Sequence, residues 1–325
     1  MTNAVTLPAR ASRCQEFHGY PSGSSTCQIT SFSPAQIRIP EHMILHSETP
    51  APKSKKNQHP IIVSLIHHIE SDSYVLFDLG LGPNWQEYAP KDRLDEIVET
   101  YEPRGGESVD QVVQRLGVES TQIKAIVISH NHWDHCAHDF SRFSNAKIIG
   151  GPTTLSNIVA LSSVSMETLE LDWKDKHPIL TFTDSYDVFE DGSCLVVPTP
   201  GHTPGHVALV VRTHATGEYV VLAGDCAHHP ACLGNASITP KGEEPRTGAW
   251  YDDANQFHSM HEDYELAERS LERLKALERI DDRDKGQFMV VLAHDFNRWN
   301  AWQDKLMKED GTVRLDGWKE KGMRI

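Results

Sequence analysis

The chain has 325 residues, of which 38% are hydrophobic and 24% are charged, and this ordinary globular composition excludes collagen-like, coiled-coil and disordered chains. The net charge of −15 argues against a nucleic-acid-binding surface, and the absence of any apolar run of about 18 residues predicts no membrane-spanning helix. The unusual number is 19 histidines, because histidine is the commonest metal ligand and a frequent acid or base.

The first 35 residues are rich in Ser, Pro and other polar residues, and they predict an irregular N-terminal arm. They contain no apolar stretch of the kind that a secretory signal needs, so we expect a cytoplasmic protein. Length alone allows either two domains or one domain with insertions.

Regular elements are predicted from about residue 61 onward. Two β-branched or aromatic runs, 61–66 and 74–77, predict two strands joined by a turn. Apolar residues at helical spacing predict a helix over 94–101. A second helix should begin after Ser108, where Gln111 completes a capping box, and end at Gly117.

Four later strands each lead into a histidine or an aspartate. The predicted strands are followed by these side chains: 125–128 by His130, 195–197 by His202, 219–223 by Asp225, and 288–293 by His294. Buried strands of a layered α/β fold deliver the residues after them to one rim of the sheet, which is where sites form. We therefore expect these side chains to lie together.

An insert of about residues 228–285 separates the last two of these strands. Its first part, to about residue 261, is a Gly- and Pro-rich loop that is either a lid or a plain connector. Its second part predicts an amphipathic helix over about 262–280, with one apolar face made of Ala267, Leu271, Leu274 and Leu277.

The densest polar cluster is HNHWDH at residues 130–135. His130 and His132 are two residues apart on an extended strand exit, so their imidazoles project the same way and can reach one metal ion. Asp134 and His135 lie where the chain turns into a helix and can point to a second ion. Three histidines and one aspartate in six residues are hard to explain without a metal, and zinc suits these donors.

The HxHxDH motif, His202 in TPGHT, Asp225 in GD and the late His294 together resemble the metallo-β-lactamase superfamily over roughly residues 60–300. The resemblance implies an α/β fold, a single-domain αββα sandwich over residues 36–325, with a dinuclear metal site at the rim between the sheets. It implies a first metal held by His130, His132 and His202, and a second held by Asp134, His135 and His294, with Asp225 bridging. It also implies that Asp78 in FDLG orients a ligand histidine.

Within that superfamily the chain is most similar to the lactonase branch, such as the acyl-homoserine lactone lactonases, and fungal-type lactamases remain an alternative. In that branch a tyrosine three residues after the bridging aspartate contacts the substrate carbonyl. His228 occupies this position here, and it either polarises a carbonyl or is a solvated loop residue. Trp85, Trp133 and Trp250 would suit a flat or acyl-bearing substrate, or they are packing residues.

The resemblance implies a hydrolase with two Zn²⁺, or other divalent ions such as Fe or Mn. It would open a small-molecule cyclic ester or amide by attack of a metal-bridging hydroxide. Asp134 would hold that hydroxide and pass its proton to the leaving group, and His228 is the second catalytic candidate.

Two other functions stay open. They are a thioesterase of the hydroxyacylglutathione hydrolase or carrier-protein type, and a mononuclear-iron dioxygenase. An anionic thiol carrier would favour basic residues beside the site, and only Lys241 and Arg246 occur in the loop there. Neither a nucleic acid nor a membrane is an expected partner, and a homodimer is one of the oligomeric states that the sequence leaves open.

Overall fold

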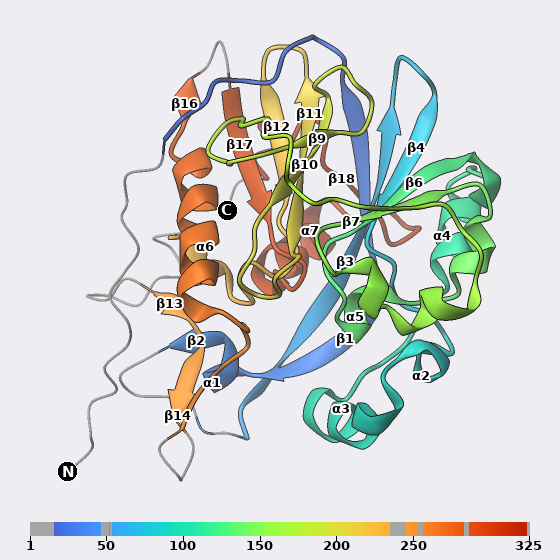
Figure 1. Cartoon of the computed structure of the whole chain (residues 1–325), viewed down its shortest axis with the longest axis vertical. Helices are drawn as coiled ribbons and strands as arrows, with labels where there is room; N and C mark the ends of the chain where they lie inside the picture. Colours follow the sequence, from blue (N-terminus) through green and yellow to red (C-terminus); the bar gives the residue numbers. More distant parts are fainter. Residues whose placement is uncertain are drawn as a thin grey trace.

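The computed structural model describes residues 16–46, 52, 54–234, 245–251, 256–282 and 286–323. Within these residues two β-sheets pack face to face, and helices cover the outer face of each sheet (Figure 1). This layer order is the αββα sandwich that the sequence predicted. No helix in the described part is long and apolar enough to cross a membrane.

The first sheet has seven strands in the described chain. Their order is β18 (Val313–Arg314), β1 (Cys27–Pro40), β3 (Lys56–His68), β4 (Ser73–Phe77), β6 (Ile123–Ile128), β7 (Lys147–Gly150) and β8 (Thr168–Glu170). The strands from β4 to β8 run parallel to one another. Residues that follow β4 and β6 therefore meet at the same edge of this sheet.

The second sheet has six strands among the described residues. Their order is β16 (Asp281–Asp282), β17 (Gly286–Val291), β12 (Glu218–Leu222), β11 (Val207–His214), β10 (Cys194–Pro198) and β9 (Tyr186–Asp187). β12 and β17 are parallel, and β10 shares their direction because both β10 and β12 are antiparallel to β11. The residues after β10, β12 and β17 are thus also delivered to one edge.

Apolar residues fill all the spaces between the layers. Along β4, Val75 and Phe77 point toward the second sheet, whereas Leu76 points to the outer helical layer, as the alternation of a strand requires. The outer layers are held by α4 (Val109–Arg115) on the first sheet and by α6 (Tyr264–Glu278) on the second. The helix predicted over 262–280 is α6, and its apolar face is buried as expected.

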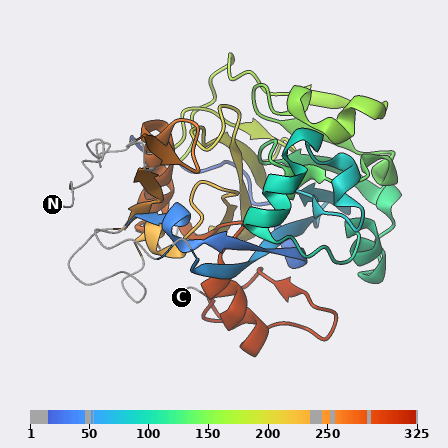
Figure 2. The ribbon, with the colours of Figure 1, turned by 90° about the horizontal axis from the view of Figure 1, so that it is seen from below.

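The remaining helices are short or lie near the ends of the sandwich. They are α1 (Glu41–Ile44), α2 (Trp85–Tyr88), α3 (Leu94–Tyr101), α5 (Trp133–Cys136) and α7 (Phe296–Lys305). Seen from below, α7 and the C-terminal segment lie beneath the strand pair β1 and β3 (Figure 2). The capping box predicted at Ser108 and Gln111 opens α4.

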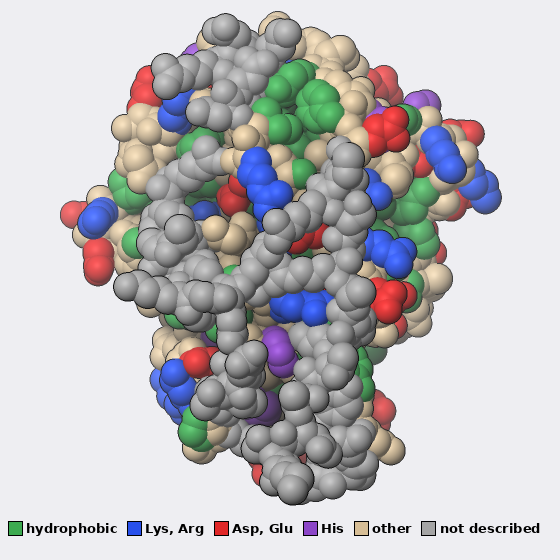
Figure 3. All heavy atoms as spheres, turned by 90° about the vertical axis from the view of Figure 1, so that its left-hand side faces the viewer, with side chains coloured by type: hydrophobic (Ala, Val, Ile, Leu, Met, Phe, Trp, Pro, Cys, Tyr) green, Lys and Arg blue, Asp and Glu red, His purple; other side chains and the backbone are tan. Residues whose placement is uncertain are grey.

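The insert contains more regular structure than a loop followed by a helix. A two-stranded sheet joins β13 (Arg246–Thr247) to β2 (Leu45–His46), and another joins β14 (Ala249–Tyr251) to β15 (Phe257–Ser259). The parts of the predicted loop at 235–244 and 252–255, with Lys241, lie outside the described residues. On the α6 side, the visible Lys and Arg side chains are interspersed with Asp and Glu (Figure 3).

The prediction that the irregular N-terminal arm extends to residue 35 was wrong. β1 begins at Cys27, so residues 27–35 form the first part of a strand inside the first sheet, and residues 1–15 of the arm lie outside the described part. The strand was hidden because its alternation of buried residues, such as Ile29, with partly exposed ones is interrupted near Ser33 and Pro34. Pro34 falls where the register with β3 shifts between Phe32 and Ala35, and such irregularities are where strands tolerate proline.

Replacing Trp302 with alanine should cost about 3–5 kcal/mol of unfolding free energy, because its side chain is 1% exposed in the apolar interior. Denaturant unfolding followed by circular dichroism measures this. Val98→Ala is the control, since Val98 is 51% exposed on α3 and its loss should change stability by no more than about 0.5 kcal/mol. Equal stability of the two variants would contradict the packing described.

Candidate metal centre

The segment after β6 brings four candidate ligands to the rim. β6 ends at Ile128, and His132, which has an extended backbone conformation, directly precedes α5. Asp134 and His135 lie in the first turn of α5 and are buried, as is His130. The change from strand to helix within six residues turns these side chains toward two neighbouring points.

His202 is delivered by a tight turn after β10. The Gly201 backbone has a φ of +130°, which favours glycine, and its N–H donates to the carbonyl of Thr203. His206 closes the turn: its Nδ1 donates to Thr199 Oγ1 at 2.8 Å, and its Nε2 accepts from the Asp225 N–H at 3.0 Å. Burial lowers the pKa of His206 to about 3, so this ring is neutral and ties two ligand segments together.

Asp225 follows β12, and His294 follows β17. Asp225 Oδ2 lies 3.5 Å from Nε2 of both His202 and His294, 3.3 Å from His135 Nε2 and 3.8 Å from His130 Nε2. One carboxylate oxygen therefore lies among imidazoles from three other parts of the chain.

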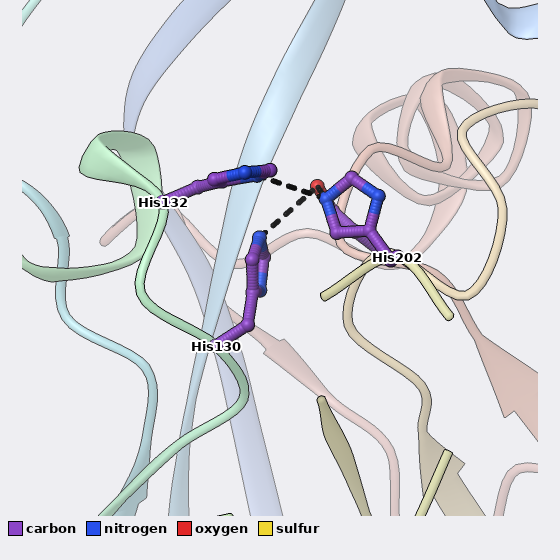
Figure 4. A group of neighbouring side chains, drawn as sticks. His130, His132 and His202 are labelled. Atoms are coloured by element: carbon purple, nitrogen blue, oxygen red, sulfur yellow. Dashed lines mark hydrogen bonds and ion pairs between the residues drawn. The ribbon is translucent and has the colours of Figure 1, made fainter. Parts of the chain in front are cut away.

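The candidate ligands form two groups that share Asp225. Within each group one ligand atom per residue lies within 4.8 Å of all the others; the groups are His130, His132, His202 and Asp225, and Asp134, His135, Asp225 and His294. In the first group the imidazoles of His130 and His132, from the green segment after β6, and of His202, from the yellow turn, converge (Figure 4). The structure thus brings together all seven residues that the sequence singled out as metal ligands.

The ligand imidazoles fall into two groups, one with lowered and one with raised pKa values. Burial lowers the pKa of His130 and His202 well below the usual range and that of His132 to about 4, so these rings are neutral. Burial opposes charge on His294 as well, but Asp225 and Asp134 outweigh it and raise its pKa to about 10.

His135 behaves like His294. Burial lowers its pKa, but Asp225 and Asp78 outweigh burial and raise it well above the usual value. Burial raises the pKa of Asp225, whereas His135 and His294 pull it well below its usual range. The buried carboxylates Asp78, Asp134 and Asp225 therefore favour the protonated, positively charged forms of His135 and His294.

The ligand set fits a pair of divalent cations. Among the described residues, buried atoms without a hydrogen-bond partner include Nε2 of His130, His135 and His294, and Oδ1 of Asp225. Buried polar atoms are normally hydrogen-bonded, so this concentration of open lone pairs at one point needs an explanation. Imidazole nitrogens and carboxylate oxygens are the donors that Zn²⁺ and related ions prefer.

Asp78 supports the centre from behind. It has a φ of +61° directly after β4, and its carboxylate accepts from Ser129 N at 2.7 Å, Ser129 Oγ at 2.8 Å and His135 Nδ1 at 2.8 Å. The last bond directs His135 Nε2 to the metal side. His294 is oriented in a similar way, since its Nδ1 donates to the Pro60 carbonyl at 2.8 Å.

A cavity of about 400 Å³ opens onto the ligands. At its base lie His132, Asp134, Asp225, His228 and His294. The apolar part of its wall is formed by Ile37, Ile39, Met43, Trp133, Trp250 and Met260, and the polar part by Arg93, Glu96, Tyr101, His258 and Ser259. Of the three tryptophans singled out in the sequence, Trp85 does not line the cavity; it is buried behind Trp133, with ring centroids 5.4 Å apart. Trp133 and Trp250 do face the cavity.

His228 lies beside the ligands rather than on a solvated loop. Its Nε2 is 3.1 Å from Asp225 Oδ2, and its ring lies nearly parallel to that of His294, with 10° between the planes. Arg246 lies 3.5 Å from Glu268 and does not line the cavity.

Sequence reasoning missed several residues of this region. His59, on β3, donates from Nδ1 to the carbonyl of His294, and Tyr101, from α3, lines the cavity. His261, in the insert, lies against His202. None of the three belongs to the ligand motifs, and only the convergence of distant elements places them here.

Asp78→Asn should weaken metal binding at the group containing His135 about 10- to 100-fold, because the amide cannot accept all three hydrogen bonds. Competition with a chromophoric chelator measures the two affinities. Asp172→Asn, on an exposed carboxylate, is the matched control and should bind metal as the parent chain does. Unchanged affinity in Asp78→Asn would show that this carboxylate does not support the centre.

Comparison with known proteins agrees with this geometry. Metallo-hydrolase mfmC of Annulohypoxylon moriforme is 27% identical over 298 residues, which cover 80% of this chain and 75% of that protein. Gamma-lactamase MBL2 of Gibberella moniliformis is 29% identical over 191 residues, covering 52% of this chain and 77% of that protein. The chain spans less than a third of the length of some longer relatives.

Solved structures show the same fold. A crystal structure of a B. thuringiensis AiiA mutant with N-decanoyl-L-homoserine bound at the active site gives a TM-score of 0.59 at 19% identity, covering 87% of this chain and 96% of that chain. The sequence profile described as Metallo-beta-lactamase superfamily matches residues 62–279, more than half of the chain. This protein therefore belongs to the metallo-β-lactamase superfamily.

Proposed function

We propose that this protein is a dinuclear metal hydrolase that opens the ring of a small cyclic ester or amide, with zinc as the metal that suits its donors. The observation that carries the proposal is the pair of ligand groups that share Asp225 at the base of a cavity. Two bound divalent cations would lower the pKa of a water molecule and polarise the substrate carbonyl.

The chain's own residues supply the proton handling. Asp134 lines the cavity, and its Oδ2 lies 3.3 Å from His294 Nε2. It is therefore placed to accept the proton of the attacking water and to return it to the leaving oxygen or nitrogen. An amide needs this second transfer more than an ester does, because an amide anion is a poor leaving group.

The charges of the cavity lining favour a neutral ring substrate over an anionic thiol carrier. Arg93 is the cationic side chain among the described lining residues, and both carboxylate oxygens of Glu96 pair with one edge of its guanidinium, at 3.1 Å from Nε and 3.1 Å from Nη2. A glutathione or carrier-protein thioester would need an available cation there. The gamma-lactamase relative supports the cyclic amide among the possible rings.

The direct test is turnover by the full chain loaded with Zn²⁺ on a panel of lactones, lactams and thioesters. We expect ring opening to exceed thioester cleavage, loss of turnover after treatment with a strong chelator, and recovery when Zn²⁺ is restored. Faster thioester cleavage would favour the thioesterase alternative. Undiminished ring opening in a fully metal-stripped sample would refute the mechanism.

His228→Ala should lower kcat for ring opening about 100-fold while two metals stay bound, because the variant loses a donor at the cavity base. Steady-state kinetics and metal analysis on the same preparation separate the two effects. His214→Ala, on an exposed histidine of β11, is the control and should match the parent chain. An unchanged kcat in His228→Ala would remove His228 from the catalytic groups.

A further inference from the structure

His261 of the insert contacts a metal-ligand candidate directly. Its Nδ1 lies 3.2 Å from Nδ1 of His202, and the side chain is buried, with the residue 5% exposed. The His261 ring centroid is 5.2 Å from that of His202 and 5.7 Å from that of His228. No ligand motif includes this residue.

The backbone around His261 is attached to the turn that carries His202. Glu262 N donates to the His202 carbonyl at 3.1 Å, and Asp263 N donates to the Gly201 carbonyl at 2.9 Å. A Cβ atom at Gly201 would come within 2.1 Å of Ala267 N, so α6 approaches this turn as closely as a glycine permits. The start of α6 and the ligand turn are therefore directly bonded and closely packed.

Together with a bound cation, this contact would define which nitrogen of each ring carries a proton. His202 Nε2 faces the ligand cluster, 3.5 Å from Asp225 Oδ2, so it must be unprotonated to bind a cation. His202 Nδ1 then bears the hydrogen and donates it to His261 Nδ1. The hydrogen of the neutral His261 ring must in turn be on Nε2.

Other ligand imidazoles receive equivalent support. Nδ1 of His135 donates to Asp78, and Nδ1 of His294 donates to the Pro60 carbonyl. His202 differs because its acceptor is another imidazole, contributed by the insert. Such outer partners fix the tautomer and orientation of a ligand, and their loss weakens metal binding.

We propose that His261 is a positioning residue of the metal centre, which holds His202 in the tautomer and orientation that binds the cation of the His130, His132 and His202 group. The insert then completes the centre rather than merely connecting two strands. This inference rests on the dinuclear site of the proposed function, but it concerns metal affinity and not the identity of the substrate.

Two variants separate hydrogen bonding from space filling. His261→Leu fills the site without an acceptor, whereas His261→Asn can place its Oδ1 close to the position of Nδ1. Co²⁺ titration of the full chain, followed by its visible absorption, should show one of two Co²⁺ ions bound about 10- to 100-fold more weakly by His261→Leu. His261→Asn should recover most of this affinity. His138→Leu, a buried histidine that bonds to α4, is the control and should bind both ions normally.

Normal binding of both Co²⁺ ions by His261→Leu would overturn the proposal, and so would equal weakening in the leucine and asparagine variants. Ring ¹⁵N NMR of the unmodified, Zn²⁺-loaded chain needs no variant and covers the case in which a variant does not fold. We expect protons on His202 Nδ1 and His261 Nε2, and a proton on His261 Nδ1 would overturn the proposal. If two Co²⁺ ions bind but no ring opens, the proposed function fails while the role of His261 stands.

Discussion

The arrangement of the candidate metal ligands depends on one buried carboxylate oxygen. Asp225 Oδ2 lies between 3.1 and 3.8 Å from Nε2 of five histidines, which come from four separate parts of the chain. An unpaired buried carboxylate would be strongly destabilising, so the fold must supply positive charge at this point. Because both ligand groups share Asp225, this carboxylate would couple two bound cations, and it follows β12, which pairs in parallel with β17.

The imidazoles around that oxygen are hydrogen-bonded to the protein on one side and face the cavity on the other. Behind the ligands, Asp78, Pro60 and His261 accept hydrogen bonds from the far nitrogens of three imidazoles. In front, the ligands face a cavity whose wall is partly apolar and partly polar. Several ligand atoms have no hydrogen-bond partner within the described residues, so the protein bears a stability cost that bound metal would offset. Metal binding and folding are thereby linked.

Local patterns in the sequence were sufficient to predict the strands that lead into candidate metal ligands. In each of them an apolar run indicates a buried strand, and the histidine or aspartate after it indicates a ligand at the end of that strand. They were also sufficient for α6 and for the capping box of α4. β1 was not visible, because its alternating pattern is interrupted by Ser33 and Pro34 at the register shift. His261 and Tyr101 could not be assigned either, because each reaches the site only through the packing of elements that are far apart in the chain.

We propose that Asp225 joins two metal ions in one buried site. Elemental analysis of the purified full chain, alongside Asp225→Ala, tests it most directly. We expect two divalent ions per parent chain and loss of affinity for both ions in the variant. A single iron per chain, as a mononuclear-iron dioxygenase would hold, or two ions that remain fully bound without the Asp225 carboxylate, would contradict it.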